Sequence, residues 1–172
     1  MFRVAGNVLR GAFVAVPMAV TFRDLVGTVL PVTGRSMQPT LNPNAQGEDA
    51  TQDYVWEASL AVWDKVDRGD VVSFRSPFNP DEKLVKRLIA MDGDWVRPGG
   101  GAGGGIGAPL LHVPRGHCWV EGDNPVLSDD SNSYGPIPMA LLEGRVTHVL
   151  WPPHRVGPLK KAIPGTSAVR IG

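Results

Sequence analysis

The stretch that does most to decide the fold is residues 34–40, which read Gly34-Arg35-Ser36-Met37-Gln38-Pro39-Thr40. An apolar, β-prone run at residues 29–33 leads into it. Pro39 and Pro43 prevent a regular helix or a central strand from continuing beyond it. Ser36 is therefore expected in a tight turn at the end of a strand.

Farther along the chain, a second β-prone segment carries a lysine among apolar neighbours. Residues 83–90 read Lys83-Leu84-Val85-Lys86-Arg87-Leu88-Ile89-Ala90. In a strand, alternate side chains share a face, so Lys86 lies on the face of Leu84 and Leu88 and Arg87 points the other way. The opposite face is also apolar, so the alternation does not decide which face is the core. Lys83 is kept as a second candidate.

Short apolar runs separated by turns predict a mainly β body. The chain has 21 glycines and 16 prolines, which favour many turns between short strands. Strands are predicted at residues 54–56, 60–63, 71–74, 83–90, 117–121 and 144–151, and a helical turn stays open for the first two. The glycine-rich residues 99–107 are predicted to form a flexible loop, because no strand-to-helix unit surrounds them and no Gly-Lys-Ser/Thr element follows.

Charge, length and cysteine count narrow the classes of function. With 17 basic and 17 acidic residues the formal net charge is zero, which argues against nucleic-acid binding. A length of 172 residues corresponds to one domain with appendages. The single cysteine, Cys118, is predicted to be a buried strand thiol rather than a nucleophile. It permits no internal disulfide, so the redox compartment stays open.

The N-terminal segment is predicted to anchor the chain in a membrane. Residues 11–22 are twelve uncharged residues, or about 18 Å of helix against a hydrocarbon core of about 30 Å. Extension to residue 30 gives a marginal span that encloses Arg23 and Asp24. Arg3 and Arg10 keep the N-terminus on the side of synthesis or import. A cleaved signal peptide is the alternative, although cleavage near Thr28 would leave the serine turn close to a new terminus.

Three parts follow from these patterns: residues 1–30 with the membrane anchor, residues 31–157 as the folded body, and residues 158–172 as a loosely ordered tail. In the body, the pairing of a serine in a tight turn with a lysine among apolar neighbours indicates hydrolytic chemistry. A hydroxyl becomes a nucleophile when a base takes its proton, and a lysine acts as that base when burial lowers its pKa.

Four ordered segments carry a resemblance to a known family. They are the Ser36 turn, Gly69-Asp70-Val71-Val72, residues 84–94 around Lys86, and residues 122–136, which read Gly-Asp-Asn-Pro-Val-Leu-Ser-Asp-Asp-Ser-Asn-Ser-Tyr-Gly-Pro. Their order and spacing resemble the type I signal peptidase family over about residues 10–157. The resemblance implies an antiparallel β domain with an extended substrate cleft and a serine endopeptidase that needs no metal or cofactor.

The resemblance also implies roles for individual residues. Ser36 would be the nucleophile and Lys86 the general base, and the Ser36 backbone N–H would stabilise the oxyanion. Ser128 would orient the Lys86 amine, and Asp130 would pair with Arg87. Met37 would lie along the substrate groove, with a core position as the alternative. Gly34 occupies the position at which many bacterial members carry a hydroxyl side chain that helps to stabilise the oxyanion.

Within the family, the chain resembles the mitochondrial members. The features concerned are Asn132, where bacterial members usually carry arginine, the segment at residues 13–22, and the ending Leu150-Trp151-Pro152-Pro153-His154-Arg155. They imply an enzyme of the mitochondrial inner membrane with its catalytic domain facing the intermembrane space. It would remove hydrophobic sorting peptides from precursor proteins and form a hetero-oligomer with a homologous protease subunit 1.

Other functions stay open at this point. A catalytically silent scaffold subunit is disfavoured by the intact Ser36 and Lys86, and a bacterial or plastid type of signal peptidase is a further alternative. A repressor-type Ser-Lys autoprotease would require an N-terminal DNA-binding domain, which the first thirty residues do not contain. The four histidines do not lie in a recognisable Ser-His-Asp setting.

Overall fold

Antiparallel strands make up most of the regular structure in the computed structural model, which describes residues 13, 15–18, 20–21, 25–44, 51–59, 66–99, 109–162 and 168–169. The main sheet contains β1 (Gly27–Pro31), β2 (Tyr54–Ser59), β3 (Val71–Arg75), β4 (Lys83–Ala90), β7 (His117–Glu121), β8 (Ile137–Pro138), β9 (Leu142–Trp151) and β10 (Gly157–Pro158). A smaller sheet contains β5 (Trp95–Val96), β6 (Leu111–His112) and β11 (Ala168–Val169).

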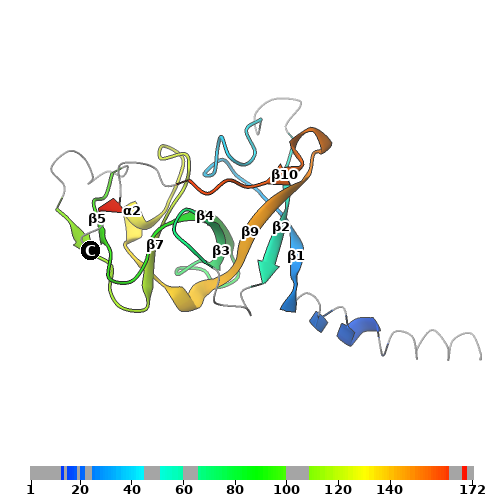
Figure 1. The fold of residues 1–172 in the computed structure, drawn as a ribbon, viewed down its shortest axis with the longest axis horizontal. Helices are drawn as coiled ribbons and strands as arrows, with labels where there is room; N and C mark the ends of the chain where they lie inside the picture. Colours follow the sequence, from blue (N-terminus) through cyan, green and yellow to red (C-terminus); the bar gives the residue numbers. More distant parts are fainter. Residues whose placement is uncertain are drawn as a thin grey trace, which may run out of the picture.

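The long strand β9 organises the main sheet. The strand order is β1-β2-β9-β3-β4-β7-β8, with β10 also pairing with β9. In Figure 1 the orange β9 runs diagonally across the body, with β2 along one part of it and β3 along another. Register shifts interrupt its pairing with both neighbours, and such irregularities bend a sheet. The result is a curled antiparallel sheet, and the predicted mainly β class is confirmed.

Both faces of β4 are covered by apolar side chains. Leu88 packs with Val72 and Phe74 in one buried cluster, whereas Val85 packs against a second cluster that contains Val71. This double coverage explains why alternation alone could not identify a core face. The strands predicted at residues 71–74, 83–90, 117–121 and 144–151 are confirmed.

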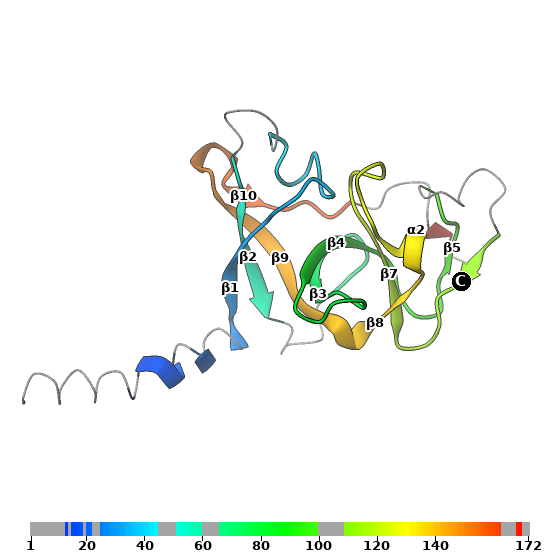
Figure 2. The same cartoon turned by 180° about the vertical axis from the view of Figure 1, so that it is seen from behind.

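The described residues near the N-terminus are helical and lie beyond the start of β1, outside the sheet (Figure 2). Their large apolar side chains, Phe13, Val16, Met18, Val20 and Leu25, are exposed. In the part of the chain that the structure describes, no helix has both the length and the apolarity needed to span a membrane.

The C-terminal residues differ from the loosely ordered tail that the sequence predicts. Leu159 N–H donates to the Thr147 carbonyl at 2.8 Å, and Ala162 N–H donates to the Gly69 carbonyl at 3.3 Å. Residues 168–169 form β11, which pairs with β5. The sequence does not predict these contacts of the C-terminal residues, because the hydrogen bonds join backbone groups rather than particular side chains. The strand predicted at 60–63 and most of the glycine-rich loop lie outside the described residues.

Candidate active site

Ser36 lies in a turn between β1 and a segment that returns along the sheet. Gly34 has φ of +83°, a conformation that favours glycine. The Leu41 N–H donates to the Met37 carbonyl at 2.9 Å, and both side chains are buried in one core cluster. These buried residues anchor the turn and leave Ser36 half-buried beside a groove.

The Lys86 side chain is buried, with only 4 % of the residue exposed. Burial lowers the pKa of this amine below its usual range, and the carboxylates of Asp130, Asp129 and Glu82 raise it by less. Nζ lies 3.0 Å from Ser128 Oγ, to which it donates. Among the described residues, no carboxylate lies within ion-pair distance of Nζ. These surroundings favour the neutral amine that a general base requires.

Asp130 organises the turn that presents Ser128. Its carboxylate accepts from Ser128 Oγ at 2.5 Å and from the Gly122 N–H at 2.8 Å. It also caps α2 (Ser131–Tyr134) by accepting from the Asn132 N–H at 3.1 Å. The predicted polar turn therefore contains a short helix, and Asp130 fixes the Ser128 hydroxyl next to the Lys86 amine.

The Ser36 turn contacts the Ser128 turn directly. Asn124 N–H donates to the Ser36 carbonyl oxygen at 2.9 Å. A Cβ at position 122 would overlap both the Ser36 carbonyl oxygen and Ser128 Oγ, so Gly122 permits this close approach. In both overall views the two turns rise from the same side of the sheet (Figures 1 and 2). Ser36, Ser128 and Lys86 are thus brought into one site.

A groove of about 310 Å³ runs between the end of β1 and the start of β4, and Ser36 and Lys86 both line it. Its walls come from residues 30–34, 36–37 and 82–86. Met37 is only 3 % exposed, so it belongs to the core cluster and also contributes to this wall. Among the described strands, β1 pairs only with β2, and residues 83–86 of β4 pair only with β3. Both sides of the groove therefore offer a strand edge.

The resemblance implies that Arg87 pairs with Asp130. In the structure Arg87 pairs with Asp123 instead. The two side chains form a bidentate ion pair with Nε–Oδ1 at 2.7 Å and Nη2–Oδ2 at 2.6 Å. Arg87 projects from the opposite face of β4 to Lys86, whereas Asp130 lies on the side of Lys86. Arg87 Nη1 also donates to the Gly69 carbonyl at 2.7 Å. Arg87 therefore ties β4 to the start of the turn, one residue after Gly122.

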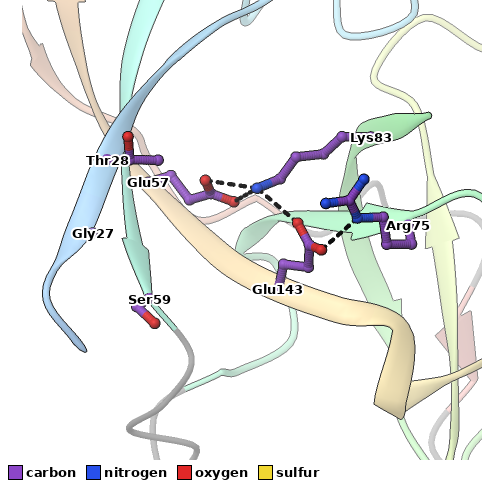
Figure 3. A pocket seen from close by; sticks show the side chains of 7 residues that line it. All are labelled: Gly27, Thr28, Glu57, Ser59, Arg75, Lys83 and Glu143. Carbon is purple, nitrogen blue, oxygen red and sulfur yellow. Dashed lines mark hydrogen bonds and ion pairs between the residues drawn. The ribbon is translucent and has the colours of Figure 1, made fainter. Parts of the chain in front are cut away.

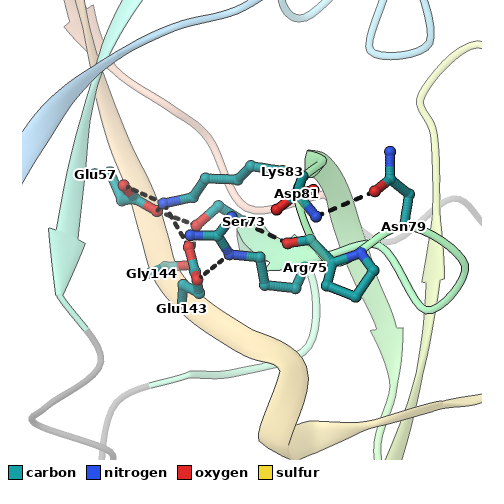
Figure 4. Close-up of polar contacts among 9 residues, drawn as sticks. Glu57, Ser73, Arg75, Asn79, Asp81, Lys83, Glu143 and Gly144 are labelled. Atoms are coloured by element: carbon teal, nitrogen blue, oxygen red, sulfur yellow. Dashed lines mark hydrogen bonds and ion pairs between the residues drawn. The ribbon is translucent and has the colours of Figure 1, made fainter.

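Lys83, the second candidate base, belongs to a different cluster. Its Nζ lies 2.6 Å from a Glu57 oxygen and 2.8 Å from a Glu143 oxygen. Figure 3 shows it reaching between these two carboxylates, with Arg75 contacting Glu143. Figure 4 adds Ser73, whose hydroxyl donates to Glu57. The Lys83 amine is thus engaged by two carboxylates rather than by the Ser36 turn.

This ion-pair cluster lines a second pocket of about 210 Å³, and the sequence prediction missed it. The one available signal is Glu57, a carboxylate inside the apolar strand β2 that is 4 % exposed. A Cβ on Gly144 of β9 would overlap the Glu57 side chain, so the carboxylate packs directly against a neighbouring strand. A buried acid of this kind requires partners, which Lys83 and Ser73 supply.

Other candidate groups are arranged differently. Cys118 is buried, and burial raises the pKa of its thiol to about 12, which disfavours a nucleophilic thiolate. Within the described residues, no group of three or more His, Cys, Asp and Glu side chains is placed to hold a metal ion.

Comparison with known proteins yields one family model and several relatives. The model described as signal peptidase, peptidase S26, matches residues 6–102. Mitochondrial inner membrane protease subunit 2 of Mus musculus is 47% identical over 156 residues, which cover 90% of this chain and 85% of that protein. Mitochondrial inner membrane protease subunit 1 of Xenopus tropicalis is 34% identical over 140 residues, covering 81% and 78%. The crystal structure of a signal peptidase I from Enterococcus faecalis, 26% identical, aligns with a TM-score of 0.40 over 48% of this chain and 97% of that chain.

Proposed function

Because the chain belongs to the signal peptidase family, peptidase S26, we propose that it is a serine endopeptidase with Ser36 as nucleophile and Lys86 as general base. One observation carries this assignment. The Lys86 amine is buried, it donates to the Ser128 hydroxyl, and it lines the same groove as Ser36. A lysine in these surroundings gives up its proton far more readily than one in water.

The reaction follows the usual course of acyl transfer. The neutral Lys86 amine takes the proton of Ser36 Oγ as this oxygen attacks the scissile carbonyl carbon. The Ser36 backbone N–H stabilises the resulting oxyanion. The Lys86 ammonium then protonates the leaving amine, and the C–N bond breaks to give an acyl-enzyme. Lys86, neutral again, activates the water that releases the acyl group.

Ser128 and Asp130 position the base. Ser128 Oγ donates to Asp130, so its lone pairs are directed toward the Lys86 amine, which donates to it at 3.0 Å. One Lys86 N–H bond is thereby fixed, and the amine lone pair is left for Ser36. Asp130 acts through Ser128 and through its cap on α2, rather than through Arg87.

The substrate is an extended peptide. The edges of β1 and β4 on either side of the groove offer backbone groups for pairing with one. Leu30, Val32, Leu84 and Val85 line the groove and favour small apolar side chains. Such a site suits the hydrophobic sorting peptides of precursor proteins.

We place the enzyme at the mitochondrial inner membrane, with the catalytic domain facing the intermembrane space. The names of its relatives support the membrane, and the exposed apolar side chains of the N-terminal helical residues support an anchor. Relatives include both subunit 1 and subunit 2 of an inner membrane protease, so we infer a hetero-oligomer with a homologous subunit 1.

Processing of a precursor by the full-length chain, alone and with the homologous subunit 1, tests this function. Ser36→Ala is expected to abolish cleavage while the circular dichroism spectrum stays unchanged. Ser133→Ala removes a hydroxyl from an exposed serine of α2 and is the matched control, expected to cleave normally. If the complex of subunit 1 with the Ser36→Ala chain cleaves the precursor as well as the wild-type complex does, the chain is a scaffold subunit. If the Ser36→Ala chain alone still cleaves the precursor, the nucleophile is a different residue.

A further inference from the structure

A buried polar network joins the Ser36 turn to the C-terminal end of the main sheet. It consists of Asn42, Asp53 and Arg155, which we call the clamp. We propose that the clamp sets the position of Ser36 relative to Lys86, so that these three are positioning residues for the reaction. This inference rests on the proposed function, and it gives a role to Arg155 in the ending at residues 150–155.

Asn42, where the chain leaves the turn, bonds back to the segment that enters it. Its side-chain Nδ2 donates to the Val32 carbonyl at 2.6 Å and to the Gly34 carbonyl at 3.2 Å, just before Ser36. Its Oδ1 accepts from the Asp53 N–H at 2.7 Å, and its own N–H donates to Asp53 Oδ2 at 2.8 Å. The chain entering the turn is thereby fixed to the chain leaving it.

The backbone at Asn42 restricts which residues fit there. Asn42 has φ of +51°, and it is the one non-glycine residue with positive φ among those described. Asparagine tolerates this left-handed conformation better than most residues. With only 2 % of the residue exposed, its amide has no access to bulk water as an alternative partner. Both the backbone and the side chain therefore select asparagine.

Arg155 connects this arrangement to the sheet. It ends η3 (Pro153–Arg155), directly after β9, and forms an ion pair with Asp53, which is 1 % exposed. Its Nη2 donates to the Thr40 carbonyl at 2.7 Å. Thr40 is thus held by a residue from the far end of β9. Breaking such a buried ion pair on one side is strongly destabilising, so the contact is a firm one.

None of the three side chains hydrogen-bonds to Ser36 or to Lys86, which separates positioning from catalysis. The clamp fixes Val32, Gly34 and Thr40, which lie on both sides of the nucleophile. A misplacement of about 1 Å reduces a reaction about 10²-fold. Loss of the clamp is therefore expected to lower kcat more than it raises KM.

The first test is steady-state cleavage by Asn42→Gly. Glycine keeps the left-handed backbone and removes only the side-chain bonds. We expect kcat to fall about 10²-fold with KM within about twofold. Asn44→Gly, at an exposed position two residues on, is the matched control and should match the wild type.

The second test needs no substrate. A thiol introduced by Ser36→Cys is alkylated with iodoacetamide over a range of pH. Buried Cys118, with its raised pKa, contributes little background. Beside the Lys86 amine the new thiol should titrate below the ordinary range for cysteine. Adding Asn42→Gly should return the profile toward that of an ordinary thiol, and adding Asn44→Gly should not.

The outcomes separate the clamp from the proposed function. If Asn42→Gly changes neither kcat nor the alkylation profile while Ser36→Ala abolishes cleavage, the clamp is wrong and the peptidase stands. If the alkylation profile changes but the wild type cleaves no precursor, the clamp stands and the function is wrong. A lowered melting temperature with unchanged kcat would show a merely structural network and overturn the clamp. If Asn42→Gly does not fold, Arg155→Lys is measured by the same two readouts.

Discussion

Two lysines of β4, its first residue Lys83 and its fourth residue Lys86, lie in opposite surroundings. Lys83 and Lys86 are three residues apart, so they project from opposite faces of the strand. Lys83 lies in a cluster of charges, between Glu57 and Glu143 (Figure 3). Lys86 lies where burial dominates, with the Ser128 hydroxyl as its hydrogen-bond partner.

The comparison shows that partners, rather than sequence neighbours, decide what a buried lysine does. Both lysines line the groove, and only Leu84 and Val85 separate them in the sequence. At position 83, two carboxylates stabilise the ammonium, and the ammonium in turn satisfies the buried Glu57. At position 86, carboxylates act only from a distance, and desolvation disfavours the charge. Lys83 thus contributes to stability, whereas Lys86 has the surroundings that its proposed role as proton acceptor requires.

The largest expected difference between substitutions of Lys86 and Lys83 is in activity. Lys86→Met should lower kcat/KM for precursor cleavage by at least about 10³-fold, because the base is lost. Lys83→Met should lower it by no more than about tenfold, since this side chain only lines the groove. Both variants are compared under one set of conditions with the full-length chain. Equal losses would erase the distinction between the two lysines.

The next difference concerns the stability of the fold, which we expect Lys83→Met to lower and Lys86→Met to raise. Lys83→Met leaves Glu57 buried without its cation and should destabilise the fold by about 3 kcal/mol. Lys86→Met removes a desolvated amine and should raise the melting temperature by about 2–5 °C at pH 7. Differential scanning calorimetry of the two variants measures both changes.

The pH dependence of that gain is a further check. The pKa of Lys86 is lowered in the folded state, so the unfolded chain binds more protons between the folded pKa and 10.5. The wild type is thus penalised below its folded pKa and recovers stability as pH rises through it. The advantage of Lys86→Met should shrink in that range. An advantage that stays constant would mean that Lys86 is not desolvated.

The sequence predicts the parts of this site that depend on local pattern. The turn at Ser36 follows from an apolar run stopped by prolines, and the strand with Lys86 follows from residues 83–90. Family membership follows from the four ordered segments, and the comparisons confirm it. The membrane anchor and the residue roles in catalysis stay predictions.

What the sequence did not predict depends on contacts between distant segments. Asp123 and Asp130 both lie in the same polar turn, and no pattern along the chain says which one faces Arg87. The ion pair of Arg155 with Asp53 joins the last residue of η3 to the residue before β2, about a hundred positions apart in the sequence. The sequence leaves Lys83 open as a candidate because both faces of its strand are apolar, and the partners that exclude it, Glu57 and Glu143, come from β2 and β9. Partner choice of this kind requires the folded arrangement.

The smallest expected effect sharpens the account of Lys86 itself. Cleavage requires the neutral amine, so kcat/KM should rise with pH through the lowered pKa of Lys86. The exposed Asp129 carboxylate raises this pKa by stabilising the ammonium. Asp129→Asn should therefore move the acidic limb of the pH profile to lower pH at low salt. Added salt should reduce the shift, because the carboxylate is exposed.

The control for this measurement is Asp92→Asn, which removes the same charge from an exposed carboxylate in the turn after β4. Asp92 lies two residues beyond the end of β4, and its carboxylate is not among the groups that shift the Lys86 pKa. Its acidic limb should coincide with that of the wild type. If both variants move the limb equally, net charge rather than the local field controls the base. If neither does, the limb belongs to another group, and the contrast between the two lysines loses its basis in proton transfer.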